Sequence, residues 1–180
     1  MNKLEKLWRT CSKCKDLNPC NHVFYRGRIP CDILFIGEAP GHNEDLCGLP
    51  FVGRSGNLLD SLIVEAKHDL DFVHGITNVL CCIPIDKAAK IRPPTREEAK
   101  NCRPRLNETI IRTNPSMLCI LGTVAKKYTK TMKATRILPT LELAHPAYML
   151  RNGGINSLDY MRSVIYLKEF VEKNYAKKED

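Results

Sequence analysis

Short apolar runs, separated by longer amphipathic stretches, set the strongest limit on how this chain can fold. Three of them cover Asp32–Ile36, Ile76–Leu80 and Ser116–Leu121, and a weaker one covers Arg136–Pro139. Runs of this length with glycine or polar boundaries are typical of buried strands. None approaches the ~20 apolar residues that a membrane span needs. The pattern therefore predicts a buried sheet and no membrane partner.

Helical patterns lie between and after these runs. They are expected over Gly56–Lys67, Thr95 to about Arg112, Thr123–Thr131 and Ser157–Tyr175. The second begins with a capping-box spacing, in which Thr95 is the N-cap and Glu98 closes the box. Strands that alternate with helices predict an α/β fold, with a mostly parallel sheet covered on both faces. A chain of 180 residues suits one domain over residues 1–180.

The charge balance is basic, with 28 Lys and Arg against 20 Asp and Glu and a net charge of +8. Such a balance favours a polyanionic partner such as nucleic acid, although a solvated basic surface explains it equally well. The first residues, Met1–Lys6, are charged and are not followed by an apolar stretch. This argues against a signal peptide, so a cytoplasmic location is expected.

Nine cysteines in a chain without a secretory signal favour metal or cluster ligation over disulfides, because their number is also odd. Cys11 and Cys14 have the two-residue spacing that lets both thiolates reach one metal or cluster. They lie in a polar, cysteine-rich segment over residues 1–24. Cys82 and Cys102 are remote in sequence but can complete four ligands. Spacing alone leaves zinc and an iron–sulfur cluster both open.

Three polar or glycine-rich segments are expected at the same edge of the sheet, where the carboxyl ends of the parallel strands lie. They are Gly37–Gly41, Asn78 and His145-Pro146. Ligands of open α/β sheets bind at this edge. The glycines allow close approach of backbone to a ligand, although no Gly-Lys-Ser/Thr ending of a P-loop is present. Their shared position predicts a binding site at the carboxyl edge of the sheet.

Three side chains expected near this edge of the sheet each have a structural and a functional interpretation. Phe51, between Pro50 and Gly53, can present a flat face to a planar ligand or pack in the core. Asn78 can match one donor and one acceptor on a base edge, or bond to nearby backbone. His145 can stabilise negative charge on a leaving group, or lie in a surface loop.

Taken together, these segments resemble the uracil-DNA glycosylase superfamily, specifically the family-four enzymes of bacteria and archaea. The resemblance runs from Cys11 to about Arg151. It is carried by Gly37-Glu38-Ala39-Pro40-Gly41, Glu44-Asp45, Gly48–Arg54, Ile76–Val79 and His145–Arg151. It implies a three-layer α/β/α sandwich with a four-stranded parallel sheet.

The resemblance also implies a [4Fe-4S] cluster. Its ligands would be Cys11, Cys14, Cys82 and Cys102. The family usually has Lys-Cys-Arg-Pro after the asparagine, whereas this chain has Cys81-Cys82-Ile83-Pro84. Either of these adjacent cysteines can be the third ligand, and the alignment favours Cys82.

Base recognition is the next property that the resemblance implies. Phe51 would stack on a flipped uracil, and Asn78 would pair with its N3–H and O4. Glu44 matches a position that blocks the methyl group of thymine. These roles predict selection of uracil over the other bases.

The implied chemistry centres on the leaving base and the attacking water. His145 would stabilise the charge that develops at O2, while Glu38 and the backbone of Ala39 and Pro40 would line the pocket and help place the water. Ala39 stands where the best-known branch of the superfamily has a water-activating Asp. A carboxylate general base is therefore not implied.

The implied activity is removal of uracil from single- or double-stranded DNA by a monomeric repair enzyme, which leaves an abasic site. The base must be flipped out of the duplex first, and Arg151 is expected to contact the DNA. Two other functions are compatible with the residues. One is a non-catalytic member that binds nucleic acid or a modified base, and the other is a zinc-stabilised DNA-binding module.

Overall fold

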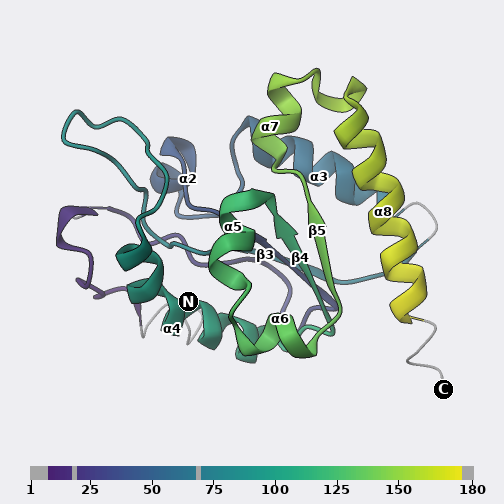
Figure 1. Ribbon diagram of the computed structural model, residues 1–180, viewed down its shortest axis with the longest axis horizontal. Coiled ribbons are helices and arrows are strands. Elements are labelled where there is room, and N and C mark those ends of the chain that lie inside the picture. The colour runs from purple at the N-terminus through teal and green to yellow at the C-terminus, as the bar shows by residue number, and fades with distance from the viewer. Residues whose placement is uncertain (1–7, 18–19, 68–69, 176–180) are drawn as a thin grey trace.

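A computed structural model describes residues 8–17, 20–67 and 70–175. Its centre is a five-stranded sheet (Figure 1) with the strand order β1-β3-β2-β4-β5. The strands are β1 (Arg26–Gly27), β2 (Ile33–Gly37), β3 (His74–Asn78), β4 (Met117–Leu121) and β5 (Thr140–Leu143). The four strands β3, β2, β4 and β5 pair in parallel, as expected. The two-residue strand β1 adds an antiparallel edge that the sequence pattern did not predict.

Helices cover both faces of the sheet, which confirms the expected α/β/α layers (Figure 1). One face carries α3 (Arg54–Ala66), α7 (Pro146–Arg151) and α8 (Leu158–Tyr175), and the other carries α4 (Arg96–Thr113), α5 (Gly122–Thr129) and α6 (Lys133–Ile137). Shorter helices are η1 (Lys15–Leu17), α2 (His42–Cys47) and η2 (Gly154–Asn156).

The strand β2 shows how one apolar run supports two cores. Ile33 and Phe35 pack in the core under α3 and α8, while Leu34 and Ile36 pack in the core under α4 and α5. All four side chains are 0% exposed. Successive side chains of a strand point to opposite faces, so a continuous apolar run is what a strand between two helical layers requires.

The expected strand over Arg136–Pro139 is wrong. Residues 133–137 form α6, with Ile137 65% exposed, and the strand β5 begins one residue after Pro139. Proline has no N–H to donate to a ladder, but its carbonyl can still accept, and Leu118 N donates to Pro139 O at 2.9 Å. The proline therefore marks the start of the strand rather than its end.

Helix boundaries follow the sequence closely where a cap is present. Glu98 N donates to Thr95 Oγ1 at 3.2 Å and Thr95 N donates to Glu98 Oε2 at 2.7 Å, which confirms the capping box of α4. The short helices α2 and α7 lie in segments for which no helix was expected.

The N-terminal cysteine-rich segment packs against the body through Leu17 and Cys14, which join the core on the α4 side. Within the expected segment 1–24, residues 1–7 and 18–19 lie outside the described residues. None of the described helices combines the length and apolar character needed to cross a membrane.

Candidate active site

The three segments expected to form the site meet at the carboxyl edge of the sheet. Gly37 and Asn78 are paired in register at the ends of β2 and β3, and His145 follows the end of β5. A cavity of about 210 Å³ lies between them. It is lined by Glu38, Ala39, Pro40, Gly41, Glu44, Phe51, Ser55, Asn78, Pro84, Ile91, Arg92, His145 and Ala147. All seven residues expected to contact the base therefore line one cavity.

Asn78 is 1% exposed, and its side-chain oxygen Oδ1 has no hydrogen-bond partner among the described residues. Its backbone carbonyl is held by the Arg105 guanidinium, which donates at 2.6 Å. Buried amide oxygens are nearly always paired, and leaving one unpaired costs about 1–3 kcal/mol. Because Asn78 lines the cavity, Oδ1 is placed to accept a hydrogen bond from a ligand.

Gly37 leaves room for this amide and for the ring of Phe51. An ideal Cβ on Gly37 would lie 2.5 Å from Asn78 Oδ1 and 2.5 Å from Cζ of Phe51. These separations are far below van der Waals contact, so any side chain at residue 37 would displace one of the two groups. The glycine at the end of β2 therefore lets the amide and the ring pack closely together in the cavity wall.

Phe51 has a positive φ of 56°, which is uncommon for a bulky side chain and indicates a constrained backbone. Its ring is 5% exposed, and its centroid lies 5.9 Å from that of His145 at an interplanar angle of 33°. An ideal Cβ on Gly56, in the first turn of α3, would lie only 1.9 Å from the Phe51 carbonyl oxygen. The ring belongs to the core and also lines the cavity, so the core interpretation is confirmed and stacking on a ligand stays a prediction.

His145 is the N-cap of α7, and its Nδ1 accepts a hydrogen bond from Ala147 N at 3.1 Å. A backbone N–H can only donate, so the proton of the neutral ring is on Nε2. Burial, with a contribution from the charge of Arg151, lowers the pKa of His145 to about 4. The ring is therefore neutral at pH 7, with one donor remaining.

Two carboxylates line the cavity, and they differ in their hydrogen bonds. Glu44 accepts three backbone hydrogen bonds, from Gly41 N at 3.1 Å, Val52 N at 3.0 Å and Gly53 N at 2.9 Å. Burial raises the pKa of Glu38, whose carboxylate has no hydrogen-bond partner in the described part of the chain. Glu44 thus holds the glycine-rich loop together, and Glu38 is the carboxylate available to a ligand or water.

The sequence did not indicate that five further residues line the cavity, Ser55, Pro84, Ile91, Arg92 and Ala147. Three of them belong to the loop over residues 83–94, for which no site residue was named. A β-bridge between Ile85 and Ile91 folds this loop back on itself, and an ion pair of 2.6 Å joins Arg92 to Glu98. This tertiary arrangement brings the loop to the cavity mouth.

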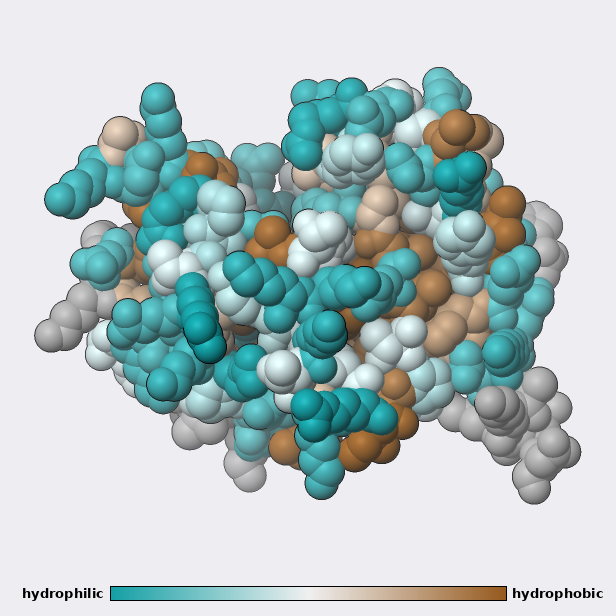
Figure 2. Space-filling view, viewed as in Figure 1, coloured by the Kyte–Doolittle hydropathy of each residue, from teal (hydrophilic) through white to brown (hydrophobic). Residues whose placement is uncertain are grey.

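The cavity shares lining residues with two open depressions that contain cations. Figure 2 shows a notch in the outline of the molecule, with mainly hydrophilic side chains on its rims. Arg151 is exposed at the end of α7 and lines two open depressions, one shared with Arg54 and the other with Lys126. The expected DNA-contact residue therefore lies beside the cavity and with other cations.

A second, smaller cavity gathers the cysteines expected to bind a cluster. It is lined by Cys11, Lys13, Cys14, Leu17, Leu80, Cys81, Cys82, Asn101 and Cys102. Cys102 Sγ lies 3.7 Å from Cys81 Sγ, and Asn101 Nδ2 lies 3.9 Å from Cys14 Sγ. Hydrogen bonds from Cys102 and Cys82, with the charge of Arg105, lower the pKa of the Cys81 thiol well below its ordinary value, and the same hydrogen bonds raise the pKa of Cys102 and Cys82. Thiolates are the form that binds metals.

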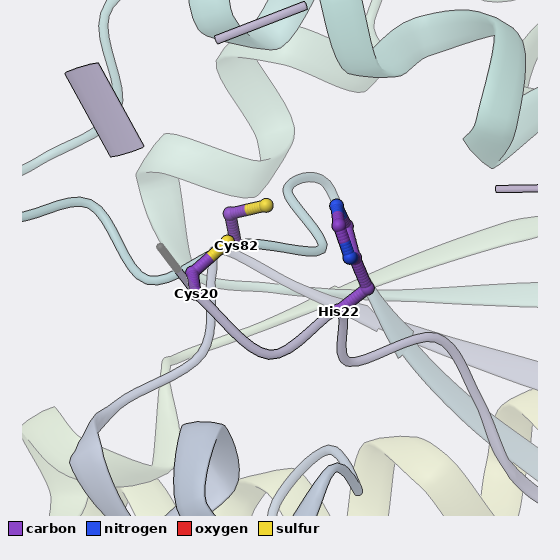
Figure 3. A group of neighbouring side chains, drawn as sticks. All are labelled: Cys20, His22 and Cys82. Carbon is purple, nitrogen blue, oxygen red and sulfur yellow. The ribbon is translucent and has the colours of Figure 1, made fainter. Parts of the chain in front are cut away.

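Cys82 also has neighbours that the sequence did not indicate (Figure 3). The ligand atoms of Cys20, His22 and Cys82 all lie within 4.8 Å of one another. Both Cys81 and Cys82 line the cysteine-lined cavity, so both are candidates for the third ligand. The proximity of Cys20 and His22 arises from the fold of the N-terminal segment, and no spacing rule signals it.

The chain matches the family model described as the uracil DNA glycosylase superfamily over residues 24–167. A protein from Thermotoga maritima named Type-4 uracil-DNA glycosylase is 32% identical over 188 residues, which cover 95% of this chain and 92% of that protein. The chain belongs to the uracil-DNA glycosylase superfamily. Its relatives with the type-4 name agree with the family-four resemblance of its motifs.

Other members of the superfamily give the same assignment. A Type-4 uracil-DNA glycosylase from Sulfurisphaera tokodaii is 38% identical over 135 residues, which cover 71% of this chain and 58% of that protein. A solution structure of a putative uracil DNA glycosylase from Methanosarcina acetivorans superposes with a TM-score of 0.53 at 14% identity. That match covers 84% of this chain and 98% of the other, and it shows the superfamily fold.

Proposed function

We propose that this superfamily member removes uracil from DNA by hydrolysing the bond between N1 of the base and C1′ of the sugar. The observation that carries the proposal is the buried, unpaired Oδ1 of Asn78 in the cavity wall. Uracil presents a donor at N3 and an acceptor at O4. An amide with its oxygen toward N3–H and its NH2 toward O4 satisfies both atoms.

Phe51 and Gly37 complete the recognition of a flat base. The ring of Phe51 offers a face on which uracil stacks, and Gly37 lets this ring and the Asn78 amide pack side by side. Stacking of a base on an aromatic side chain contributes about 1–3 kcal/mol. Glu44 contributes by fixing the loop that carries Phe51, because its carboxylate binds the backbone of Val52 and Gly53.

His145 supplies the charge stabilisation in this mechanism. When the bond from N1 to C1′ breaks, both electrons leave with uracil, and negative charge develops on its O2. The Nε2–H of the neutral ring donates to this oxygen, since Nδ1 is held by Ala147 N. A fixed donor of this kind costs little reorganisation in the transition state.

Water completes the reaction on the sugar. Its oxygen bonds to C1′, one proton leaves through Glu38 or solvent, and uracil takes up a proton, so the products are free uracil and an abasic site. Glu38 and the backbone of Ala39 and Pro40 line the cavity where this water is placed. Burial raises the pKa of Glu38, which makes its carboxylate a better proton acceptor for this water than a solvated glutamate.

DNA approaches through the basic rim. Extraction of the base costs a few kcal/mol of stacking and pairing, and phosphate contacts to cations offset it. Arg151 and Arg54 lie beside the cavity, and Lys87 and Lys90 are exposed on the loop over residues 83–94. This distribution supports a DNA strand that crosses the cavity mouth.

A [4Fe-4S] cluster is part of the proposal. The donor set fits, because soft thiolate ligands select iron–sulfur clusters or zinc and five cysteines border one cavity. Cys11, Cys14 and Cys102 would hold the cluster together with Cys82 or Cys81. When bound, the cluster would tie the N-terminal segment to α4, a structural role remote from the base.

Incubation of the purified protein with an oligonucleotide that contains one uracil tests the proposed activity. We expect alkali-labile abasic sites at the uracil, and none in matched oligonucleotides with cytosine or thymine. The variant Tyr166→Ala, altered at an exposed side chain of α8, is the control for effects of expression and purification, and it should excise uracil like the parent. Tight binding of the uracil oligonucleotide without abasic-site formation would instead support a non-catalytic binding protein.

A further inference from the structure

Arg105 is a charged side chain in the middle of α4 that lies fully inside the protein. It is 1% exposed, and its guanidinium faces the end of β3 rather than solvent. It donates to Thr77 Oγ1 at 3.0 Å, to Asn78 O at 2.6 Å and to Val79 O at 2.7 Å. It also lies 3.6 Å from Cys102 Sγ. One side chain thus contacts both the base-recognition strand and the cysteine-lined cavity.

The positive charge of Arg105 has no carboxylate partner. No ion pair in the described part of the chain involves it. Carbonyl and hydroxyl oxygens accept from its Nη1 and Nη2, and its buried Nε has no partner among the described residues. None of these contacts neutralises its charge, and a buried uncompensated charge is strongly destabilising. The groups near it that can carry negative charge are the sulfur atoms of Cys102, Cys81 and Cys82.

We propose that Arg105 is the internal counter-ion of the cluster and, at the same time, the positioning residue that fixes the strand end carrying Asn78. This inference rests on the proposed function, because it requires cluster thiolates in the cysteine-lined cavity. Cysteines lose their protons when they bind a cluster, so an occupied site places negative charge beside the guanidinium.

The same contacts explain why the two sites are linked. Arg105 donates hydrogen bonds to the carbonyls of Asn78, the last residue of β3, and of Val79, which follows it. Thr77 Oγ1, a second partner of Arg105, donates in turn to Phe24 O at 2.6 Å. The cation therefore joins α4, β3 and the segment that follows the N-terminal cysteines. With the cluster bound, its charge is balanced and this network is stable.

The first test compares thermal unfolding with and without the cluster. Arg105→Met removes the charge, and Arg103→Met, on the same helix but bonded to Thr131 Oγ1 and Tyr128 O, is the matched control. We expect Arg105→Met to lower the melting temperature of the iron-loaded protein by several degrees more than it lowers that of the iron-free protein. Arg103→Met should lower both equally, since the Arg103 side chain bonds to Thr131 and Tyr128 and has no hydrogen bond to a cysteine in the described part of the chain.

The second test uses the iron-loaded protein alone, in case the iron-free form does not fold. The rate of iron loss to a chelator, followed by bleaching of the cluster absorbance, should rise at least several-fold in Arg105→Met. Arg105→Lys, which retains the charge, should lose iron at a rate near that of the parent. At full iron content it should still excise uracil roughly 10- to 100-fold more slowly, because lysine cannot grip both carbonyls and a small misplacement is costly.

The outcomes separate this inference from the proposed function. Equal effects of Arg105→Met with and without iron, or unchanged iron loss, would overturn the counter-ion role while uracil excision stands. An Arg105→Lys protein that excises uracil at the parental rate would overturn the positioning role. A protein that excises uracil but never contains iron would overturn the counter-ion role and the cofactor together, and leave the activity intact.

Discussion

The Oδ1 atom of Asn78 and the ring of Phe51 meet over the α-carbon of Gly37, where an ideal Cβ would lie 2.5 Å from each. The two groups proposed to read a base, one by hydrogen bonding and one by stacking, are thus set around a residue with no side chain. The shape of the cavity depends on that absence as much as on the two side chains.

Gly37→Ala should disrupt this arrangement. The added methyl group must displace the Asn78 amide or the Phe51 ring, so we expect uracil excision to fall by at least roughly 10²-fold, as for a misplacement of about 1 Å. Binding to DNA with a preformed abasic site, which needs no base in the cavity, should change little. Uracil excision and binding to abasic-site DNA are measured in parallel for the variant and the parent. Equal losses in excision and in abasic-site binding would contradict this prediction.

His145→Ala tests charge stabilisation at O2. Loss of one fixed donor to a developing anion slows catalysis by roughly 10²–10³-fold, and we expect that loss in single-turnover excision of uracil. Affinity for uracil-containing DNA should change far less, because the donor acts mainly in the transition state. Equal losses in affinity and rate would identify His145 as a positioning residue instead.

The pKa of His145, about 4 in the folded protein, predicts a pH dependence of stability. An unfolded histidine has a pKa near about 6.5, so between pH 6.5 and 4 the unfolded chain binds a proton that the folded chain does not. Stability from this residue is therefore complete above about pH 6.5 and decreases as the pH falls toward 4. Urea unfolding of the parent and of His145→Ala across this range checks it, and the difference between them should shrink on acidification.

Much of the fold and site follows from the sequence because local signals carry it. The capping box at Thr95 fixes the start of α4, and the apolar run after Asp32 fixes β2. Since parallel strands end at one edge, the residues that follow them gather there, and Asn78 and His145 line the same cavity. In these cases local chemistry and tertiary structure agree.

The remaining features depend on contacts between distant segments. A charged residue such as Arg105 is ordinarily solvated, and nothing in the pattern of α4 signals its burial against β3. The return of Ile91 to the cavity mouth depends on its bridge to Ile85. The approach of Cys20 to Cys82 depends on the path of the N-terminal segment. Periodicity and spacing contain none of this information.

Metal analysis tests the cysteine-lined cavity. Protein purified without oxygen should be brown and contain about four irons per chain, as a [4Fe-4S] cluster requires. Cys11→Ser and Cys14→Ser should lose iron, whereas Cys47→Ser, altered at an exposed cysteine remote from the cavity, should keep it. Of Cys81→Ser and Cys82→Ser, the variant that loses iron identifies the third ligand, and it should lose thermal stability more than it selectively loses chemistry. Stoichiometric zinc without iron would contradict the cluster.

Asn78→Asp tests base recognition directly. Uracil has a donor at N3 and an acceptor at O4, whereas cytosine has an acceptor at N3 and a donor at its exocyclic amine. The parent amide therefore faces cytosine with acceptor against acceptor and donor against donor, and each such mismatch in a dry pocket costs about 1–3 kcal/mol. The side-chain amide must keep one orientation for this discrimination to work, and Arg105 fixes the main chain that carries it by donating to the carbonyl of Asn78.

An ionised carboxylate at residue 78 repels O4 of uracil and accepts a hydrogen bond from the exocyclic amine of cytosine. We therefore expect Asn78→Asp to lose most uracil excision and to gain weak cytosine excision, measured on matched oligonucleotides. If Asn78 only holds the strand end together, the variant should instead melt at a lower temperature with unchanged base preference. A variant that melts like the parent and removes uracil at the parental rate would show that the buried Oδ1 does not read the base.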